Sequence, residues 1–285
     1  MRGLALIVAL FSLFSLRTSF AGVLEAHCSS KVFSGTNVKF CVNNVDRSRN
    51  QDIVYFFHGI SATEKSWFNK NDTRSIARKW MSDGYEPTVV TISFGRVWMM
   101  VENQKHQYLS LFRDQILPYL EDQLGGLRQG RRMLIGQSMG GFNAVQASLR
   151  LPGYFERVVL LCPAVTVVGP YSAPQEIRDY IKRTRAETLL VDSLIGISRQ
   201  YISDANDWDV HSALKLPERY PMGMLKPSYY VSTGRGDNFG FQEGSQLFVN
   251  TAQKLGFQAH SAPVHGFHCS FDRHGVSDFI RGVSP

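Results

Sequence analysis

A serine flanked by small residues lies where the sequence changes from a strand pattern to a helix pattern. The apolar run 132–135 precedes it, and apolar residues at helical spacing follow it from Ala144 to Leu151. A turn this tight pushes the serine hydroxyl away from the backbone, and larger neighbours would collide across the turn. The segment therefore predicts a nucleophile elbow for acyl transfer, with the sequence Gly136-Gln137-Ser138-Met139-Gly140-Gly141.

The hydroxyl of Ser138 needs an adjacent base, because a neutral serine is a poor nucleophile. His268 lies in a loop after the last predicted strand, and Asp237 follows the strand before it. An aspartate in that place can hold the imidazole in the required tautomer and stabilise the imidazolium. The order Ser, Asp, His along the chain is that of α/β-hydrolases. His265 shares the loop, and we favour His268 as the base because it directly precedes the closing helix.

Two backbone N–H groups are candidates for stabilising the negative oxygen of a tetrahedral intermediate. Met139 directly follows the nucleophile, and Ile60 lies in the loop after an early buried strand that ends at His58-Gly59. These N–H groups are the predicted oxyanion hole. We expect His58 itself to be structural.

Large apolar side chains follow the same strand ends and predict an apolar wall for the acyl group. Trp67 follows the oxyanion loop, and Trp98 and Met99 follow the predicted strand 88–93. For any one of them, a place in the core is the alternative.

Apolar runs alternate with helical patterns along the chain, which predicts a mostly parallel sheet with helices on both faces, as in the α/β-hydrolase fold. Ligands of such sheets bind at the carboxyl ends of the strands, where Ser138, Asp237 and His268 all fall. The interval 164–227 carries two further helical patterns, at 175–181 and 188–201, and is either a helical lid or an ordinary excursion. The predicted strands are 38–43, 52–57, 88–93, 132–135, 157–161, 228–233 and 258–264, and the predicted helices are 73–83, 108–124, 242–255 and 271–281, besides the one after the elbow.

The first 21 residues have the pattern of a secretory signal peptide. Arg2 supplies the positive end, Leu4 to Leu16 is apolar, and Ser19-Phe20-Ala21 offers small residues for cleavage. The apolar run is too short to span a bilayer, although Arg17 leaves an uncleaved anchor as the alternative. We expect residues 22–285 to form one domain that is secreted or periplasmic.

The formal net charge is +7, and the basic residues are scattered rather than interleaved with aromatic residues on one element. This scatter favours a solvated surface over a nucleic-acid-binding surface. No stretch beyond the N-terminal segment is long and apolar enough for a transmembrane helix. We therefore expect no nucleic-acid partner and no stable insertion into a membrane.

Export would favour disulfide bonds, because the destination is oxidising. If Ser34-Gly35 is a two-residue hairpin turn, Cys28 and Cys41 lie directly opposite each other and can be bridged. Cys162 and Cys269 both belong near the predicted site. A second disulfide bond and a pair of buried free thiols fit them equally well.

A metal site is the alternative chemistry. His265, His268 and Cys269 could bind zinc together with Cys162 or Asp272. Their spacing differs from the helical H-E-x-x-H pattern, and a metal would leave the elbow without a purpose. We therefore expect no metal and no cofactor.

The stretch from Gly136 to Phe155 resembles the esterase D and antigen 85 group of α/β-hydrolases, in which G-x-S-M-G-G leads into a helix, a proline-containing turn, a phenylalanine and a strand. The His-Gly after the early strand, the Gly-x-x-Asp turn and the Gly-x-His loop resemble its other landmarks, and the last of these implies that His268 is the base. Similarity extends over roughly Val38 to Ile280. Cys162 departs from the usual serine or alanine, and the segment 94–100 is more apolar than in many members.

The resemblance implies activity on esters, since the group includes S-formylglutathione hydrolases, feruloyl and acetylxylan esterases, polyhydroxyalkanoate depolymerases and mycolyltransferases. We expect a secreted serine carboxylic ester hydrolase acting on a small-molecule or polymer-linked ester. An acyltransferase of the mycolyltransferase type would use the same three residues. A binding module that has lost catalysis is disfavoured, because Ser138, Asp237 and His268 are all present.

Overall fold

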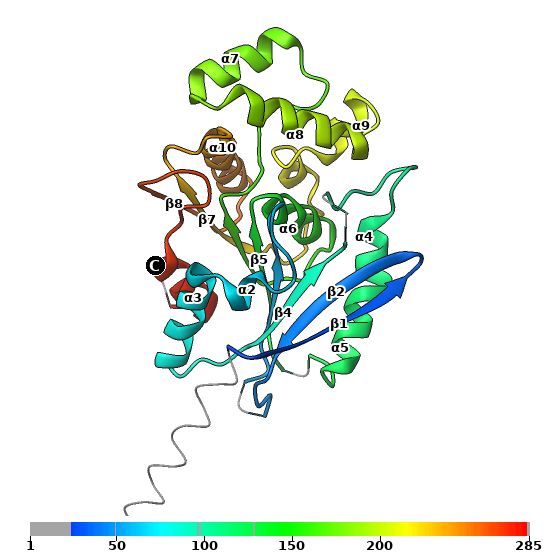
Figure 1. The fold of residues 1–285 in the computed structure, drawn as a ribbon, viewed down its shortest axis with the longest axis vertical. Helices are drawn as coiled ribbons and strands as arrows, with labels where there is room; N and C mark the ends of the chain where they lie inside the picture. Colours follow the sequence, from blue (N-terminus) through cyan, green and yellow to red (C-terminus); the bar gives the residue numbers. More distant parts are fainter. Residues whose placement is uncertain (1–23, 49, 96, 98, 128, 284–285) are drawn as a thin grey trace, which may run out of the picture.

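A computed structural model describes residues 24–283 apart from positions 49, 96, 98 and 128 (Figure 1). The predicted signal peptide, residues 1–21, lies outside the described residues. The strands are β1 (Ala26–Phe33), β2 (Thr36–Asn43), β3 (Ile53–Phe57), β4 (Thr88–Ser93), β5 (Arg132–Gln137), β6 (Arg157–Leu161), β7 (Ser228–Gly234) and β8 (Ala259–Val264). The helices that cover the sheet are α2 (Ser66–Asn69), α3 (Asn71–Ser82), α4 (Tyr108–Leu111), α5 (Leu117–Gln123), α6 (Met139–Arg150), α10 (Phe241–Lys254) and α11 (Arg273–Arg281).

The strands form one sheet in the order β1-β2-β4-β3-β5-β6-β7-β8. Pairing is antiparallel among β1, β2 and β4 and parallel from β4 to β8. The chain adds β4 on one side of β3 and β5 on the other, so the loops after β3 and β5 meet at a switch in strand order. Such a switch is the usual ligand site of an open parallel sheet. The predicted α/β fold is confirmed.

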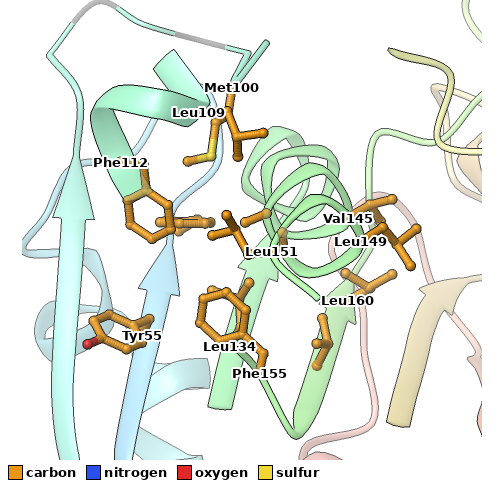
Figure 2. Packing of buried hydrophobic residues seen from close by; sticks show 14 of the residues in the cluster. Tyr55, Met100, Leu109, Phe112, Leu134, Val145, Leu149, Leu151, Phe155 and Leu160 are labelled. Atoms are coloured by element: carbon orange, nitrogen blue, oxygen red, sulfur yellow. The ribbon is translucent and has the colours of Figure 1, made fainter. Parts of the chain in front are cut away.

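The central strands are apolar throughout because both faces of the sheet are covered. All five residues of β3 are buried. Its residues Ile53, Tyr55 and Phe57 pack with α4, α5 and α6 in a large cluster on one face, shown in Figure 2. Val54 and Phe56 pack on the other face with residues of α3 and α11.

The predicted helix 108–124 is a continuous helical segment that contains one π-helical turn, η1 (Phe112–Ile116), between α4 and α5. Pro118 lies in the first turn of α5. Proline has no N–H, and its ring collides with the carbonyl one turn back in a regular helix. The wider turn before Pro118 accommodates that residue without breaking the helix.

The first two strands form the predicted hairpin. Ser34 and Gly35 have φ of 44° and 80°, the left-handed conformation that a two-residue hairpin turn needs. The turn places Cys28 opposite Cys41 in the strand register, and the two cysteines are joined by a disulfide bond. The bond lies at the β1–β2 edge of the sheet, far from β7 and β8.

The interval between β6 and β7 forms a helical insertion made of α7 (Pro174–Thr184), α8 (Thr188–Tyr201), α9 (Ala205–His211) and a short 3-10 helix, η2 (Leu216–Arg219). Figure 1 shows α7 and α8 as a stacked pair beyond one end of the sheet, above α10. Both predicted helices of this interval are therefore present. Among the described residues, no helix is long and apolar enough to cross a membrane.

Candidate active site

Ser138 forms the whole connection between β5 and α6 and has φ 55° and ψ −116°. This positive φ is strained for any residue other than glycine, and surrounding contacts hold it in place. The Ser138 N–H donates to the Leu161 carbonyl at 2.8 Å, which extends the pairing of β5 with β6. The Ser138 carbonyl accepts from the N–H groups of Gly141 and Ala164, each at 2.8 Å. The predicted strand–turn–helix context of the serine is confirmed.

The glycines around Ser138 are needed because the chain passes too close to itself for side chains. A Cβ at Gly136 would lie 2.2 Å from the Gly140 carbonyl oxygen, and a Cβ at Gly140 would lie 2.1 Å from the Phe57 carbonyl oxygen. Both separations are far below van der Waals contact. The small residues of the motif therefore allow α6 to start directly against the ends of β3 and β5.

His268 and Asp237 lie in line with the serine hydroxyl. The Oγ of Ser138 is 3.0 Å from Nε2 of His268, and Nδ1 of His268 is 2.7 Å from Oδ2 of Asp237. A carboxylate only accepts hydrogen bonds, so Nδ1 carries the proton and Nε2 is free to accept the one from the serine. Asp237 is 1% exposed, and its other oxygen accepts from the Phe239 N–H at 2.9 Å. The arrangement can remove a proton from Ser138 and stabilise the imidazolium that results.

The loop that carries His268 is held by neighbouring backbone and by two aromatic rings. The Gly236 N–H donates to the Gly266 carbonyl at 2.9 Å, which joins the aspartate loop to the histidine loop. The rings of Phe239 and Phe241 lie 4.6 Å and 5.4 Å from the imidazole, centroid to centroid. His265 is exposed, and its ring has no hydrogen-bond partner among the residues described. The geometry singles out His268 from the two histidines.

Ile60 lies in the loop after β3, and this loop passes directly beside Ser138. A Cβ added at Gly59, the residue before Ile60, would lie 3.2 Å from the Cβ of Ser138. The Gly59 carbonyl accepts from the Ala62 N–H at 3.1 Å and lies 2.8 Å from Nδ1 of His58. Burial lowers the pKa of His58, so the ring is neutral at pH 7 and can donate from Nδ1. The Ile60 N–H points opposite to that carbonyl, because the two belong to one trans peptide.

The N–H groups of Ile60 and Met139 are both unused. Within the described part of the chain, neither donates to a protein acceptor. Both residues line one cavity together with Ser138. The two predicted donors therefore remain available to a ligand beside the serine hydroxyl.

An apolar cavity of about 250 Å³ opens beside Ser138. Met99 lines it as predicted, whereas Trp98 lies outside the described residues. The expectation for Trp67 is corrected: it is 1% exposed and packs in the core against Phe56 and Trp80, apart from the cavity. Helix α2 turns its ring toward the sheet, a direction that the distance along the sequence from Gly59 does not reveal.

Several residues of the cavity wall were absent from the sequence-based predictions. They belong mainly to α8, which contributes Leu190, Leu194 and Ile197, and to the loop after β6. Phe239 from the loop after β7 and Phe241 from the start of α10 complete this part of the wall. The i, i+4, i+7 spacing of the three α8 residues is a signal of one apolar helix face. The sequence alone does not show which part of the protein that apolar face of α8 contacts.

Cys162 and Cys269 are joined by a disulfide bond, which resolves the alternatives left open for them. Both sulfurs and a ring nitrogen of His268 lie within 4.8 Å of one another, so the structure brings together these three members of the zinc set suggested by the sequence, without His265 or Asp272. The disulfide leaves neither sulfur as a thiolate, which is the form that binds zinc. The ring nitrogens of His268 already contact Ser138 and Asp237, and the two cysteines are bonded to each other.

Solved structures of several esterases are similar in fold to this chain. A solved structure described as a ferulic acid esterase is 15% identical, with a TM-score of 0.65, over 90% of this chain and 95% of that one. A hyperthermophilic esterase from the archaeon Pyrobaculum calidifontis is 18% identical, with a TM-score of 0.63, over 90% and 80%. The Pyrococcus furiosus esterase Pf2001 is 13% identical, with a TM-score of 0.58, over 90% and 92%. These likenesses show the fold.

No curated protein matches the chain in sequence. Residues 30–282 do match the sequence pattern of a family described as "Putative esterase", which covers nearly all of the described chain. The match agrees with the resemblance seen in the motif around Ser138. The chain belongs to this esterase family of α/β-hydrolases and is a carboxylic ester hydrolase.

Proposed function

We propose that this protein is a secreted serine carboxylic ester hydrolase that works through a covalent acyl-enzyme on Ser138. The observation that carries the proposal is the chain of contacts from Ser138 Oγ to His268 Nε2, at 3.0 Å, and from His268 Nδ1 to Asp237, at 2.7 Å. The family supports ester chemistry in general. The proposal adds the roles of these three residues.

In the first half of the reaction, the Ser138 hydroxyl attacks the ester carbonyl carbon while His268 takes its proton at Nε2. Asp237 stabilises the imidazolium through Nδ1–H. The carbonyl oxygen becomes negative and is stabilised by the N–H groups of Ile60 and Met139, an effect worth a few kcal/mol for each donor. His58 acts by positioning the Gly59–Ile60 peptide.

The tetrahedral intermediate then collapses, and the bond to the alcohol oxygen breaks. His268 returns its proton to that oxygen, so the alcohol leaves and the acyl group stays on Ser138. In the second half, His268 removes a proton from water, and the hydroxide attacks the acyl carbon. In the second collapse, the bond between the acyl carbon and Ser138 Oγ breaks and His268 gives its proton to that oxygen, which releases the acid and restores the Ser138 hydroxyl.

The N-terminal pattern of residues 1–21 and the two disulfide bonds support export from the cytoplasm. Residues 22–285 are then the mature enzyme. The helical insertion within 164–227 covers Ser138 through α8, as a lid would, and we keep that role as a prediction. The proposed substrate is a small-molecule or polymer-linked ester.

We expect the purified protein to hydrolyse p-nitrophenyl esters at the same rate with and without EDTA, because no step above uses a metal ion. A panel of esters and matched p-nitroanilides, each with and without the chelator, checks this. Loss of ester turnover in EDTA, or turnover confined to the anilides, would defeat the proposal.

A second experiment distinguishes a hydrolase from an acyltransferase. A primary alcohol is added to the ester assay and the products are analysed: a hydrolase should give the free acid, and an acyltransferase should give a new ester of the added alcohol.

The Cys162–Cys269 disulfide bond is expected to keep His268 in position. Cys269 directly follows His268, and Cys162 follows β6, whose Leu161 carbonyl bonds the N–H of Ser138. Replacing both cysteines with alanine should lower kcat on the order of tenfold or more with little change in KM, because small misplacements of catalytic groups reduce rates strongly. Steady-state kinetics with active-site titration measures this.

The distant disulfide bond supplies the matched control. The Cys28→Ala/Cys41→Ala variant also loses one bond, but at the β1–β2 edge of the sheet. It should be less stable to heat while its kcat stays close to that of the original enzyme. Equal values of kcat for the two double variants would refute a positioning role for the bond at Cys269.

A further inference from the structure

The cavity beside Ser138 is closed on one side by one face of helix α8. Leu190, Leu194 and Ile197 line it from α8, and each is half-buried. Their neighbours Val191 and Ile195 pack with Tyr180 of α7 in an apolar cluster, and all three also line the cavity. The insertion therefore has a small core of its own, and Leu190, Leu194 and Ile197 are the apolar residues of α8 that this core leaves half-buried at the cavity.

Another part of the cavity wall belongs to the elbow and to the helix that follows it. Met139 and Phe142, from the first turn of α6, line it together with Ser138. An acyl group bound to Ser138 would thus have its carbonyl carbon at one end of the cavity. The rest of the group would lie between α6 and α8.

Most polar side chains on the wall use their hydrogen-bonding groups inside the protein. The hydroxyls of Ser193 and Ser198 donate to carbonyls one turn back in α8, at 2.7 Å and 2.8 Å. Thr166 donates to the Val168 carbonyl at 2.6 Å, and Tyr180 donates to the Phe239 carbonyl at 2.8 Å. No Asp, Glu, Lys, Arg or His lines the cavity among the residues that the structure describes. The wall is therefore mainly apolar and suits the methylene groups of a bound ligand.

We infer that the acyl half of the substrate is an unbranched aliphatic chain of about eight carbons, bound between α6 and the α8 stripe Leu190, Leu194 and Ile197. The inference rests on the proposed function, because it takes Ser138 as the point of attachment. The length follows from the cavity volume of about 250 Å³, since a methylene is about the size of a water molecule, roughly 30 Å³. Filling the cavity would also complete the burial of the half-buried α8 side chains.

The test is the dependence of kcat/KM on chain length, measured with p-nitrophenyl acetate, butyrate, hexanoate, octanoate, decanoate and laurate. For the unaltered enzyme, kcat/KM should rise by up to about fourfold for each methylene buried, reach a maximum near octanoate and then fall. In the Leu194→Trp variant, the larger side chain occupies the cavity, and the ratio of octanoate to acetate kcat/KM should drop at least about tenfold. Leu194→Phe, a smaller change, should move the maximum toward shorter chains.

The control is Leu189→Trp. Leu189 is 80% exposed, is a neighbour of Leu190 on α8 and does not line the cavity. Its octanoate to acetate ratio should match that of the unaltered enzyme, and a shift equal to that of Leu194→Trp would overturn the assigned face. A flat or falling profile from acetate to octanoate, with acetate turnover that Ser138→Ala abolishes, overturns the inference and leaves the proposed function standing. Absence of Ser138-dependent turnover of every ester overturns the proposed function itself.

Discussion

Replacing Ser138 with alanine is expected to lower ester turnover by about 10⁴- to 10⁶-fold while the protein stays folded. The alanine removes the only atom that would form the acyl-enzyme. The remaining donors, Ile60 and Met139, could still polarise a bound ester, so a small residual rate above water is expected. Alanine keeps the Cβ, and the backbone bonds of residue 138 to Leu161 and Ala164 do not depend on the hydroxyl. Rates with a p-nitrophenyl ester and circular dichroism together measure the effect.

Ser148 offers a matched control on α6, the helix that directly follows Ser138. It is 1% exposed, and its hydroxyl bonds Tyr229 at 2.8 Å, well away from the cavity. Ser148→Ala removes a buried serine hydroxyl and a hydrogen bond worth about 1 kcal/mol. It should lower thermal stability and leave turnover near the original rate. Comparable turnover in Ser138→Ala and Ser148→Ala would exclude Ser138 as the nucleophile.

The second large effect is expected for His268→Ala, which should be nearly as damaging as Ser138→Ala. Residues that act as one catalytic unit have non-additive effects, so the double variant should be scarcely worse than either single variant. The physical reason is that Ser138 Oγ has no other base within hydrogen-bonding distance among the described residues. Measuring kcat for the two single variants and the double variant tests this.

His265→Ala is the control for the histidine assignment. His265 lies three residues earlier in the same loop, but it is exposed and its ring makes no hydrogen bond to Ser138, Asp237 or any other described residue. This variant should keep a substantial fraction of the activity. If His265→Ala were inactive and His268→Ala active, the roles of the two histidines would have to be exchanged.

The sequence predicted the central strands of the sheet well because both faces of these strands are buried. Segments such as 53–57 and 158–161 are continuous apolar runs, and their short lengths distinguish them from helices. The position of Ser138 on a strand-to-helix turn was predictable from the local sequence, because so tight a turn requires small neighbouring residues. The same holds for the hairpin that pairs Cys28 with Cys41, because a two-residue turn fixes the register of both strands.

Features that depend on contacts between distant segments were less predictable. The sequence placed Trp67 after a site loop, but the direction of its side chain is set by packing against Phe56 and Trp80. The bond between Cys162 and Cys269 joins residues 107 apart, and no local pattern distinguished it from two free thiols. The α8 stripe had a visible helical spacing, yet only the folded insertion shows that it faces the elbow.

The central claim is that Ser138 forms a covalent intermediate, and labelling with a fluorophosphonate tests it most directly. The reagent reacts with activated serines and leaves a stable adduct, which peptide mass spectrometry locates. We expect one adduct, on the peptide that contains Ser138, loss of ester turnover in proportion to labelling, and no adduct in the Ser138→Ala variant. Labelling at another residue, with ester turnover surviving in Ser138→Ala, would contradict the account.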